Sequence, residues 1–432
     1  MMNYAFVNGV ILDGKKDMEP VTGKTVLTDG DRIKDIIEGN TIPEGYEAVD
    51  LKGAYLLPGL INLHVHLATS GKPPKRDKKP TNYKKLFDLL SKHKIVLAVI
   101  KKLTADYAKM ELLSGVTTIR TVAGILDMDA RVRDDIYAGK TLGPRILAAN
   151  TGVSVPGGHF AGSIATEASS PKEAREHVRQ IASTKPDLIK LMITGGVMDS
   201  SADGEPGVLR MPPEIVRAAC EEAHSLGYKV AAHVESPEGV RVALENGVDT
   251  IEHGAKPDEE ILRLFKEKGA ALICTVSPAL PYAEFDLSES HALPIAKKNG
   301  KIVMNGVIDC AKACLEEGIP VGMGNDVGCP FVLHYNFWRE LGYFHHYVGA
   351  SNADALYTAT LGNAKIAGID NETGSIEPGK CADMIVVKED PLKDLSALRN
   401  VSMVMTRGQL IRDPKVKKDK YVDDLLDKYE KR

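Results

Sequence analysis

The sequence predicts an α/β fold in which a TIM-like (β/α)8 barrel is joined to a small β-sandwich domain. Three observations lead to this prediction. Strand and helix patterns alternate through the middle of the 432-residue chain, which is typical of a parallel sheet. Short strand patterns occupy both ends of the chain, and polar residues recur where the middle strands end. The length suits a barrel of about 250 residues or more with an accessory domain.

The two ends of the chain are expected to pair into the small domain. The N-terminal end carries short strand patterns at residues 4–12, 25–28, 32–37 and 47–50, and the C-terminal end carries them at residues 382–387 and 401–411. Neither set can build a core alone. We therefore expect one domain from residues 1–57 and 375–412, with the barrel at 58–374 inserted between them. A charged, helix-like tail at 413–432 follows, and we expect it to pack on a neighbouring subunit.

The first barrel strand is predicted in the run Leu57-Pro-Gly-Leu-Ile-Asn-Leu-His-Val-His-Leu67. Its apolar residues are typical of a buried parallel strand that opens at Pro58-Gly59. His64 and His66 are two residues apart, so both imidazoles point to the same face of the strand. Such a pair is well placed to hold a metal ion, although two hydrogen-bonded core histidines would give the same pattern.

Four further apolar runs carry a polar residue at or near their ends. These residues are Lys190, His233, His253 and Asp326. A lysine inside a buried strand is rare unless it is paired or chemically altered. The carboxyl ends of the strands form the active-site face of a parallel barrel. The sequence therefore predicts that all six side chains, with His64 and His66, gather in one site.

The segments between these strands fit the same architecture. Helices are predicted at residues 212–226 and 237–246, and each ends near a glycine, Gly227 or Gly247, that suits a left-handed cap. Residues 71–84 form a basic loop directly after the first strand. This loop is either a solvated surface loop or a mobile lid over the site.

Composition narrows the class of protein. The net charge of −4 gives no reason to expect nucleic acid or an anionic membrane as a partner. The first ten residues read as a strand and not as a signal peptide, and no apolar run approaches the ~18 residues of a membrane span. The six cysteines follow no disulfide framework. We expect a cytoplasmic protein that acts on a small molecule.

The set of motifs resembles the amidohydrolase superfamily with a two-metal site. Its pattern is His-x-His on the first strand, lysine on the fourth, histidines on the fifth and sixth, and aspartate on the eighth. Gly115-Val-Thr-Thr-Ile-Arg120 resembles the second strand of that family, and residues 373–387 resemble its return to the small domain. Residues 189–196 and Ile251-Glu-His-Gly254 resemble prolidase-type and arginine-carboxypeptidase-type dipeptidases.

The resemblance implies a ligand set and a reaction. His64, His66 and Asp326 would hold one divalent ion, and His233 and His253 the other. Lys190, carboxylated by CO2 to a carbamate, would bridge both ions. Zinc is favoured and manganese is the alternative. A hydroxide between the metals would attack an amide C–N bond, and Asp326 would be the catalytic base and acid. The substrate would be a dipeptide or an N-acyl amino acid, and homo-oligomers are common in this group.

Three residues are expected to contact the substrate: His159, Glu235 and His334. Where the dipeptidases carry an aromatic residue or histidine that helps hold the substrate carboxylate, this chain has Glu235. A glutamate repels a carboxylate and favours a cation or a hydrogen-bond donor. The usual aspartate after the strand-two arginine is replaced by Thr121. The substrate is therefore expected to differ from a standard free-carboxylate dipeptide, or to bind through other groups.

Other functions stay open at this point. A hydrolase of a cyclic amide or of a xenobiotic amide would use the same site. A mononuclear deaminase typically carries a glutamate three residues after the strand-five histidine and no bridging lysine, whereas Glu235 comes two residues after His233 and Lys190 is present. A catalytically silent scaffold would have no need of Asp326 or Lys190.

Overall fold

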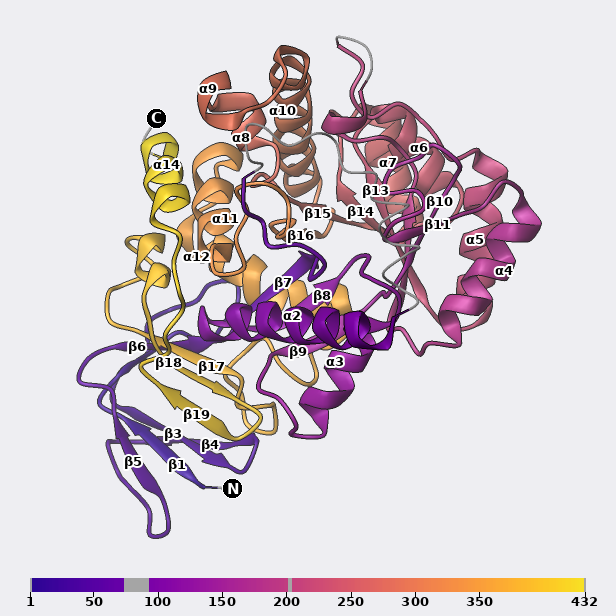
Figure 1. Cartoon of the computed structure of the whole chain (residues 1–432). Coiled ribbons are helices and arrows are strands. Elements are labelled where there is room, and N and C mark those ends of the chain that lie inside the picture. Colours follow the sequence, from indigo (N-terminus) through magenta and orange to yellow (C-terminus); the bar gives the residue numbers. More distant parts are fainter. Residues whose placement is uncertain (1, 74–92, 201–203, 431–432) are drawn as a thin grey trace.

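The computed structural model describes residues 2–73, 93–200 and 204–430 (Figure 1). The strands are β1 (Tyr4–Val7), β2 (Val10–Ile11), β3 (Lys24–Asp29), β4 (Arg32–Glu38), β5 (Glu47–Asp50), β6 (Tyr55–Pro58), β7 (Leu60–Val65), β8 (Val116–Thr121), β9 (Arg145–Ala148), β10 (Gly152–Ser154), β11 (Ala165–Glu167), β12 (Leu188–Met192), β13 (Lys229–Val234), β14 (Thr250–His253), β15 (Ala271–Cys274), β16 (Val321–Met323), β17 (Met384–Val387), β18 (Val401–Thr406) and β19 (Gln409–Arg412).

Helices separate most of the middle strands. They are α2 (Lys94–Leu113), α3 (Met128–Tyr137), α4 (Pro171–Ala182), η1 (Val197–Asp199), α5 (Pro213–Ser225), α6 (Pro237–Glu245), α7 (Glu259–Lys268), α8 (Leu280–Glu284), α9 (Leu287–Ser290), α10 (Pro294–Glu316), α11 (Phe337–Tyr343), η2 (Phe344–Val348), α12 (Asn352–Tyr357), η3 (Thr358–Gly362), α13 (Asn363–Ala367), η4 (Leu395–Arg399) and α14 (Lys420–Glu430).

The middle of the chain forms two parallel sheets. One has the strand order β11-β10-β12-β13-β14-β15-β16, and the other has the order β7-β8-β9. A parallel bridge between Val65 and Val327 brings the end of β7 beside the end of β16. The N–H of Asp187, just before β12, donates to the carbonyl of Ala148 in β9 (2.7 Å). The predicted α/β class with parallel strands is therefore confirmed.

The sequence explains where the helices that flank these strands begin and end. Ser170 caps α4 by accepting a hydrogen bond from the N–H of Glu173, and Ser236 caps α6 in the same way through Gly239. Each cap is followed directly by a proline, which suits the first helical position. Gly227 and Gly247 have φ values of 83° and 97°, as expected for the glycines that follow α5 and α6.

The strands of the N-terminal segment and those of the C-terminal segment lie together at one end of the molecule, while α14 lies beside α11 (Figure 1). Their strands form one sheet of order β4-β3-β1-β5 and another of order β19-β18-β17-β6-β2, in which β6 pairs antiparallel with β17. Apolar side chains from both ends share one cluster, to which Phe6, Val26, Leu56, Met384 and Met405 belong. The exact domain boundaries stay a prediction.

One predicted strand differs in detail. The strand expected at residues 4–12 is broken into β1 and β2, because Asn8 adopts a left-handed conformation with φ of 58°. The following residue packs closely on the chain, since a Cβ at Gly9 would lie only 2.3 Å from Leu51 Cδ1. Turn geometry therefore interrupts a run that is apolar and strand-like in sequence.

The C-terminal tail packs on its own chain, and the expected contact with a neighbouring subunit stays a prediction. The apolar face of α14, formed by Val422, Leu425, Leu426 and Tyr429, is buried. Arg339 of α11 is only 1% exposed and pairs with Asp427 and Glu430 of α14, both at 2.5 Å. Apolar burial and ion pairing together place the tail beside α11 (Figure 1).

The basic loop at 71–84 falls mainly outside the described residues. Its first residue, Gly71, accepts a hydrogen bond from the N–H of Phe331 (2.7 Å) and so begins next to the segment after Asp326. Among the helices that the structure describes, none combines the length and the apolar character needed to cross a membrane.

Candidate active site

The predicted pair on the first barrel strand lies in a fully buried element. Every residue of β7 is buried, and His64 is 1% exposed, while His66 follows the strand directly. The neighbouring chain after β16 approaches this point very closely: a Cβ at Gly324 would lie 2.4 Å from the Cβ of His64. Only glycine allows that approach, which brings the segment carrying Asp326 against the two histidines.

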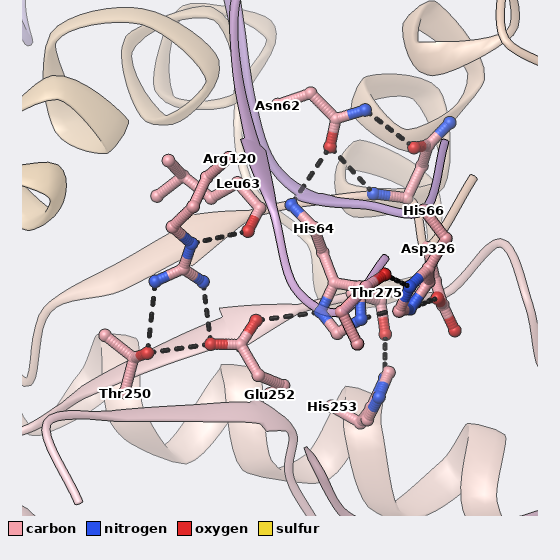
Figure 2. A network of polar contacts seen from close by, with 12 residues as sticks. Asn62, Leu63, His64, His66, Arg120, Thr250, Glu252, His253, Thr275 and Asp326 are labelled. Atoms are coloured by element: carbon pink, nitrogen blue, oxygen red, sulfur yellow. Dashed lines mark hydrogen bonds and ion pairs between the residues drawn. The ribbon is translucent and has the colours of Figure 1, made fainter. Parts of the chain in front are cut away.

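A buried ion pair orients His64 (Figure 2). Nδ1 of His64 donates to Glu252 Oε2 (2.8 Å), and the other oxygen of Glu252 accepts from Arg120 (2.6 Å). Arg120 also donates to the Leu63 carbonyl (2.7 Å) and to Thr250 Oγ1 (3.1 Å). Burial opposes ionisation of Glu252, but Arg120 and His64 outweigh burial and hold the pKa of the carboxyl well below its usual range.

The free nitrogens of His64 and His66 converge on Asp326. Nδ1 of His66 donates to the carbonyl of Ala123 (2.9 Å). Nε2 of His64 and Nε2 of His66 lie 3.3 Å and 3.1 Å from Asp326 Oδ1. Burial alone would raise the pKa of Asp326, but the two imidazoles lower it well below its ordinary value. The three side chains therefore present two imidazole nitrogens and one carboxylate oxygen to the same point.

His233 and His253 form the second half of the cluster. Their ring centroids are 4.7 Å apart, and that of His253 is also 4.7 Å from His64. Nδ1 of His253 is hydrogen-bonded to Thr275 Oγ1 (2.7 Å), and Nε2 of His233 faces the carbonyl of Gly195 (3.4 Å). Burial is the main reason that the pKa of both imidazoles lies well below the ordinary value. Both rings are therefore neutral, which is the form that binds a metal.

The backbone is strained at two of these positions. His253 has φ of 70° and Asp326 has φ of 52°, in the left-handed region that non-glycine residues rarely adopt. Such conformations cost on the order of 1–3 kcal/mol and are concentrated at functional sites. The strain aims both side chains from the ends of their strands into the cluster.

Lys190 lies in the middle of β12 and is 1% exposed. Its Nζ has no hydrogen-bond partner among the residues that the structure describes. Burial lowers the pKa of Lys190 to about 8; Glu252 and Asp326 oppose this shift, while Arg120 adds to it. A buried amine without a partner is costly. A further group that bonds to Nζ of Lys190 would remove this cost.

The donor set fits divalent metal ions. Each of the four histidines has one ring nitrogen engaged by a protein oxygen, which fixes the ring and leaves the other nitrogen free, as metal-binding histidines require. A tetrahedral ion with bonds of about 2.0–2.1 Å holds its ligand atoms about 3.3 Å apart. The distances of 3.1 and 3.3 Å from Asp326 to the two imidazoles match that spacing. His64, His253 and Asp326 form one group of candidate ligands, and His233, Glu235 and His253 form another.

Two of the three residues expected at the substrate lie beside the cluster. His159 stacks on His233 with ring centroids 4.2 Å apart and an angle of 12° between the rings, and its Nδ1 is hydrogen-bonded to Asp199. The carboxylate of Glu235 lies within 4.8 Å of the ligand atoms of His233 and His253.

The structure does not bring His334 to the cluster. Its Nε2 donates to the carbonyl of Thr69 (2.8 Å), and its Nδ1 lies 3.5 Å from Glu111 Oε1 of α2. The ring stacks on Tyr107 with 4.5 Å between centroids and is 1% exposed. Proximity to Asp326 in sequence suggested a substrate contact, but the chain turns this ring against α2.

Several residues of the site escaped the sequence analysis. They are Glu252, which holds His64; Thr275, which holds His253; Asp199, which holds His159; and Cys329, whose thiol donates to Asp326 Oδ2 (3.3 Å). Glu252 and Cys329 lie one and three residues from predicted ligands, so proximity in sequence was the available signal. Thr275 directly follows a strand, the same position that singled out the ligands.

The fold and the site together define a class of protein. Parallel strands whose carboxyl ends carry buried histidines, a lysine and an aspartate are typical of metal-dependent α/β enzymes. The chain belongs to the Amidohydrolase family, whose profile matches residues 55–411. The predicted superfamily is thereby confirmed, and the protein is an amidohydrolase.

Individual relatives agree with this family. A candidate prolidase from Bifidobacterium longum is 35% identical, with a TM-score of 0.86 over 99% of this chain and 98% of that one. A Xaa-Pro dipeptidase solved with methionine in its active site is 29% identical, with a TM-score of 0.83 over 95% of this chain and 100% of that one. Ochratoxinase from Aspergillus niger is 26% identical over 335 residues, which are 70% of this chain and 67% of that protein.

Proposed function

We propose that this protein is a binuclear metal-dependent hydrolase that cleaves the amide C–N bond of a small molecule, a dipeptide or an N-acyl amino acid. One observation carries the proposal: four buried imidazoles, each oriented by a hydrogen bond at one nitrogen, surround a buried lysine and an aspartate. A structural core has no use for six such groups in one place.

The finer architecture is part of the proposal. The contact between β7 and β16 on one side, and between β9 and β12 on the other, supports a closed (β/α)8 barrel of β7, β8, β9, β12, β13, β14, β15 and β16. The paired sheets of the chain ends would form the small β-sandwich domain. In a barrel of this kind the six site residues all lie on the face that holds active sites.

The ligands divide into two sets. His64, His66 and Asp326 would hold one ion, and His233 and His253 the other. Two divalent ions bound there supply a water that is ionised at neutral pH and polarise the scissile carbonyl. Imidazole nitrogen and carboxylate oxygen suit zinc first and manganese second.

Lys190 would complete both sets as a carbamate. Its neutral amine nitrogen would form a bond to the carbon of CO2 as one C=O π bond opens onto oxygen. The nitrogen would then release one proton to solvent, which leaves an anionic carbamate with two oxygen donors. Nζ has no hydrogen-bond partner among the described residues, which supports a carbamate there. The carbamate would replace the unpaired amine, and its two oxygens would bind the metal ions. The low pKa of about 8, caused mainly by burial, supplies the neutral amine.

Asp326 would move the proton. Its carboxylate faces His64 and His66 through Oδ1 and the thiol of Cys329 through Oδ2. The low pKa of the carboxyl keeps it ionised. Asp326 would accept a proton from the attacking water and then deliver it to the leaving amine. His159, stacked on His233, would contact the substrate at the rim of the site.

The relatives support the substrate class, and one favours a second candidate. The candidate prolidase and the Xaa-Pro dipeptidase are named for the cleavage of dipeptides. Ochratoxinase is named for ochratoxin and not for a peptide. Hydrolysis of a xenobiotic amide is therefore the second candidate function.

Hydrolysis of a panel of Xaa-Pro dipeptides, other dipeptides, N-acyl amino acids, cyclic amides and ochratoxin-like amides tests the proposal. We expect turnover of a dipeptide or N-acyl amino acid, and a loss of about 10²–10⁴-fold in kcat for Asp326→Asn. Turnover of the xenobiotic amides alone would favour the second candidate. Failure to cleave any amide, or full activity in Asp326→Asn, would contradict the mechanism.

A further inference from the structure

We propose that Glu235 is a third protein ligand of the ion assigned to His233 and His253, in addition to the ligand set proposed above. This inference rests on the proposed two-metal function. It gives Glu235 a role at the metal centre in place of the substrate contact that the sequence suggests.

The position of Glu235 follows from the end of β13. His233 lies near the end of this strand, and Glu235 is the first residue beyond it. The N–H of Glu235 donates to Thr194 Oγ1 (3.0 Å), which fixes the backbone just after the strand. The carboxylate of Glu235 and the ligand nitrogens of His233 and His253 all lie within 4.8 Å of one another. One ion can therefore reach all three with small side-chain movements.

The carboxylate of Glu235 lacks a neutralising group. Its Oε2 is buried and has no hydrogen-bond partner among the residues in the described ranges. Asp326 and Asp199 are the carboxylates that act on Glu235, and the backbone N–H of Val197 donates a hydrogen bond to it. A carboxylate with a buried, unpaired oxygen close to other carboxylates is unfavourable unless a cation stabilises it. The geometry supplies a place for that cation between Glu235 and the two histidines.

The imidazole beside Glu235 is paired with a different carboxylate. A Cβ placed on Gly196 would lie 3.6 Å from Glu235 Oε2 and 3.3 Å from His159 Cε1. The carboxylate of Glu235 and the ring of His159 therefore both lie next to Gly196. Nδ1 of His159 is already hydrogen-bonded to Asp199. His159 therefore already has a carboxylate partner, and Glu235 Oε2, which has no hydrogen-bond partner in the described part of the chain, is open to a bound cation.

A carboxylate at this position changes the character of the second metal site. With His233, His253 and a carbamate oxygen, Glu235 would give that ion two nitrogen and two oxygen donors. Oxygen donors suit zinc as well as harder ions such as manganese. We therefore expect the ion at this site to be held more tightly than it would be by two histidines and the carbamate alone.

The test measures metal directly. Wild-type protein, Glu235→Gln and the matched control Asp199→Asn are purified under the same conditions, and their zinc and manganese contents are determined by elemental analysis. Each is then challenged with a chelator, and the rate of metal loss is followed. Asp199→Asn removes one neighbouring negative charge at constant size, so it separates ligation from a general change of charge.

We expect Glu235→Gln to lose one of two ions at least tenfold faster than wild-type protein, while Asp199→Asn loses metal at about the wild-type rate. Equal retention in Glu235→Gln and wild type, with a change confined to the KM of cationic against anionic dipeptides, would overturn the ligand role and return Glu235 to the substrate. Equally rapid loss in both variants would also overturn it. If wild-type protein binds fewer than two ions, the proposed function fails and this inference fails with it. If wild-type protein binds two ions and Glu235→Gln retains both, only this inference fails.

Discussion

At the scale of single residues, Glu252 connects the candidate metal cluster to the rest of the core. It is 0% exposed, pairs with Arg120 and holds the Nδ1 of His64. Removing one partner of a buried ion pair leaves an uncompensated charge, which typically costs about 3–5 kcal/mol. Glu252 therefore affects both the stability of the fold and the orientation of a proposed ligand.

We predict that Glu252→Gln destabilises the protein by about 3 kcal/mol and weakens metal binding about 10–100-fold. The folded-state pKa of Glu252 is depressed, so its stabilising effect is present above the ordinary value of 4.5 and is lost as the pH falls below that value. The difference in Tm between wild type and Glu252→Gln should narrow from pH 6 to pH 3. A difference that is constant or grows toward low pH would contradict this account; Glu267→Gln, in an exposed ion pair with Arg263, is the control.

The histidines proposed as metal ligands were predictable from the sequence, but the residues that hydrogen-bond to them were not. His64, His66, His233 and His253 interrupt or end apolar runs, so the local pattern marks them. The partnership of Arg120 with Glu252 joins β8 to β14, which are far apart in sequence, and no local pattern reports it. His334 shows the opposite case: it is near Asp326 in sequence, yet its ring packs against Tyr107 of α2.

Among the secondary-structure elements, α14 packs against α11 and holds the C-terminal segment there. The buried guanidinium of Arg339 pairs with Asp427 and Glu430 and lies 4.5 Å from the centre of the Trp338 ring. Tyr429 of α14 contacts Phe285 at 4.6 Å between ring centroids, in the segment between α8 and α9. The charged sequence of the tail predicted a helix, but its docking surface depends on a buried arginine 80 residues or more upstream.

We predict that Arg339→Met lowers stability by about 3 kcal/mol, because two carboxylates of α14 lose their buried partner. The measurement is Tm by calorimetry, with Lys428→Met as the control on the same helix. Lys428 pairs with Glu289 at the surface, so its loss should leave Tm nearly unchanged. Equal effects of the two substitutions would show that the buried pairing does not hold the helix.

In the whole molecule, strands from the N-terminal and C-terminal segments pair with each other, and the parallel strands between them in sequence carry the site. The alternation of strands and helices predicted the α/β class because each strand and helix has its own local signature. The association of the two end segments was expected because neither could build a core alone, but the strand β6 that pairs with β17 was not predicted. How the parallel strands are ordered depends on contacts between distant segments, which a local pattern cannot specify.

We propose that this fold gathers a two-metal centre bridged through Lys190. The decisive experiment determines metal content per chain in freshly purified wild-type protein and in Lys190→Ala, together with amide hydrolysis by both. We predict about two zinc or manganese ions with turnover in wild type, and loss of both metal and turnover in Lys190→Ala. Zero or one ion in wild type, or full metal content in Lys190→Ala, would contradict the account.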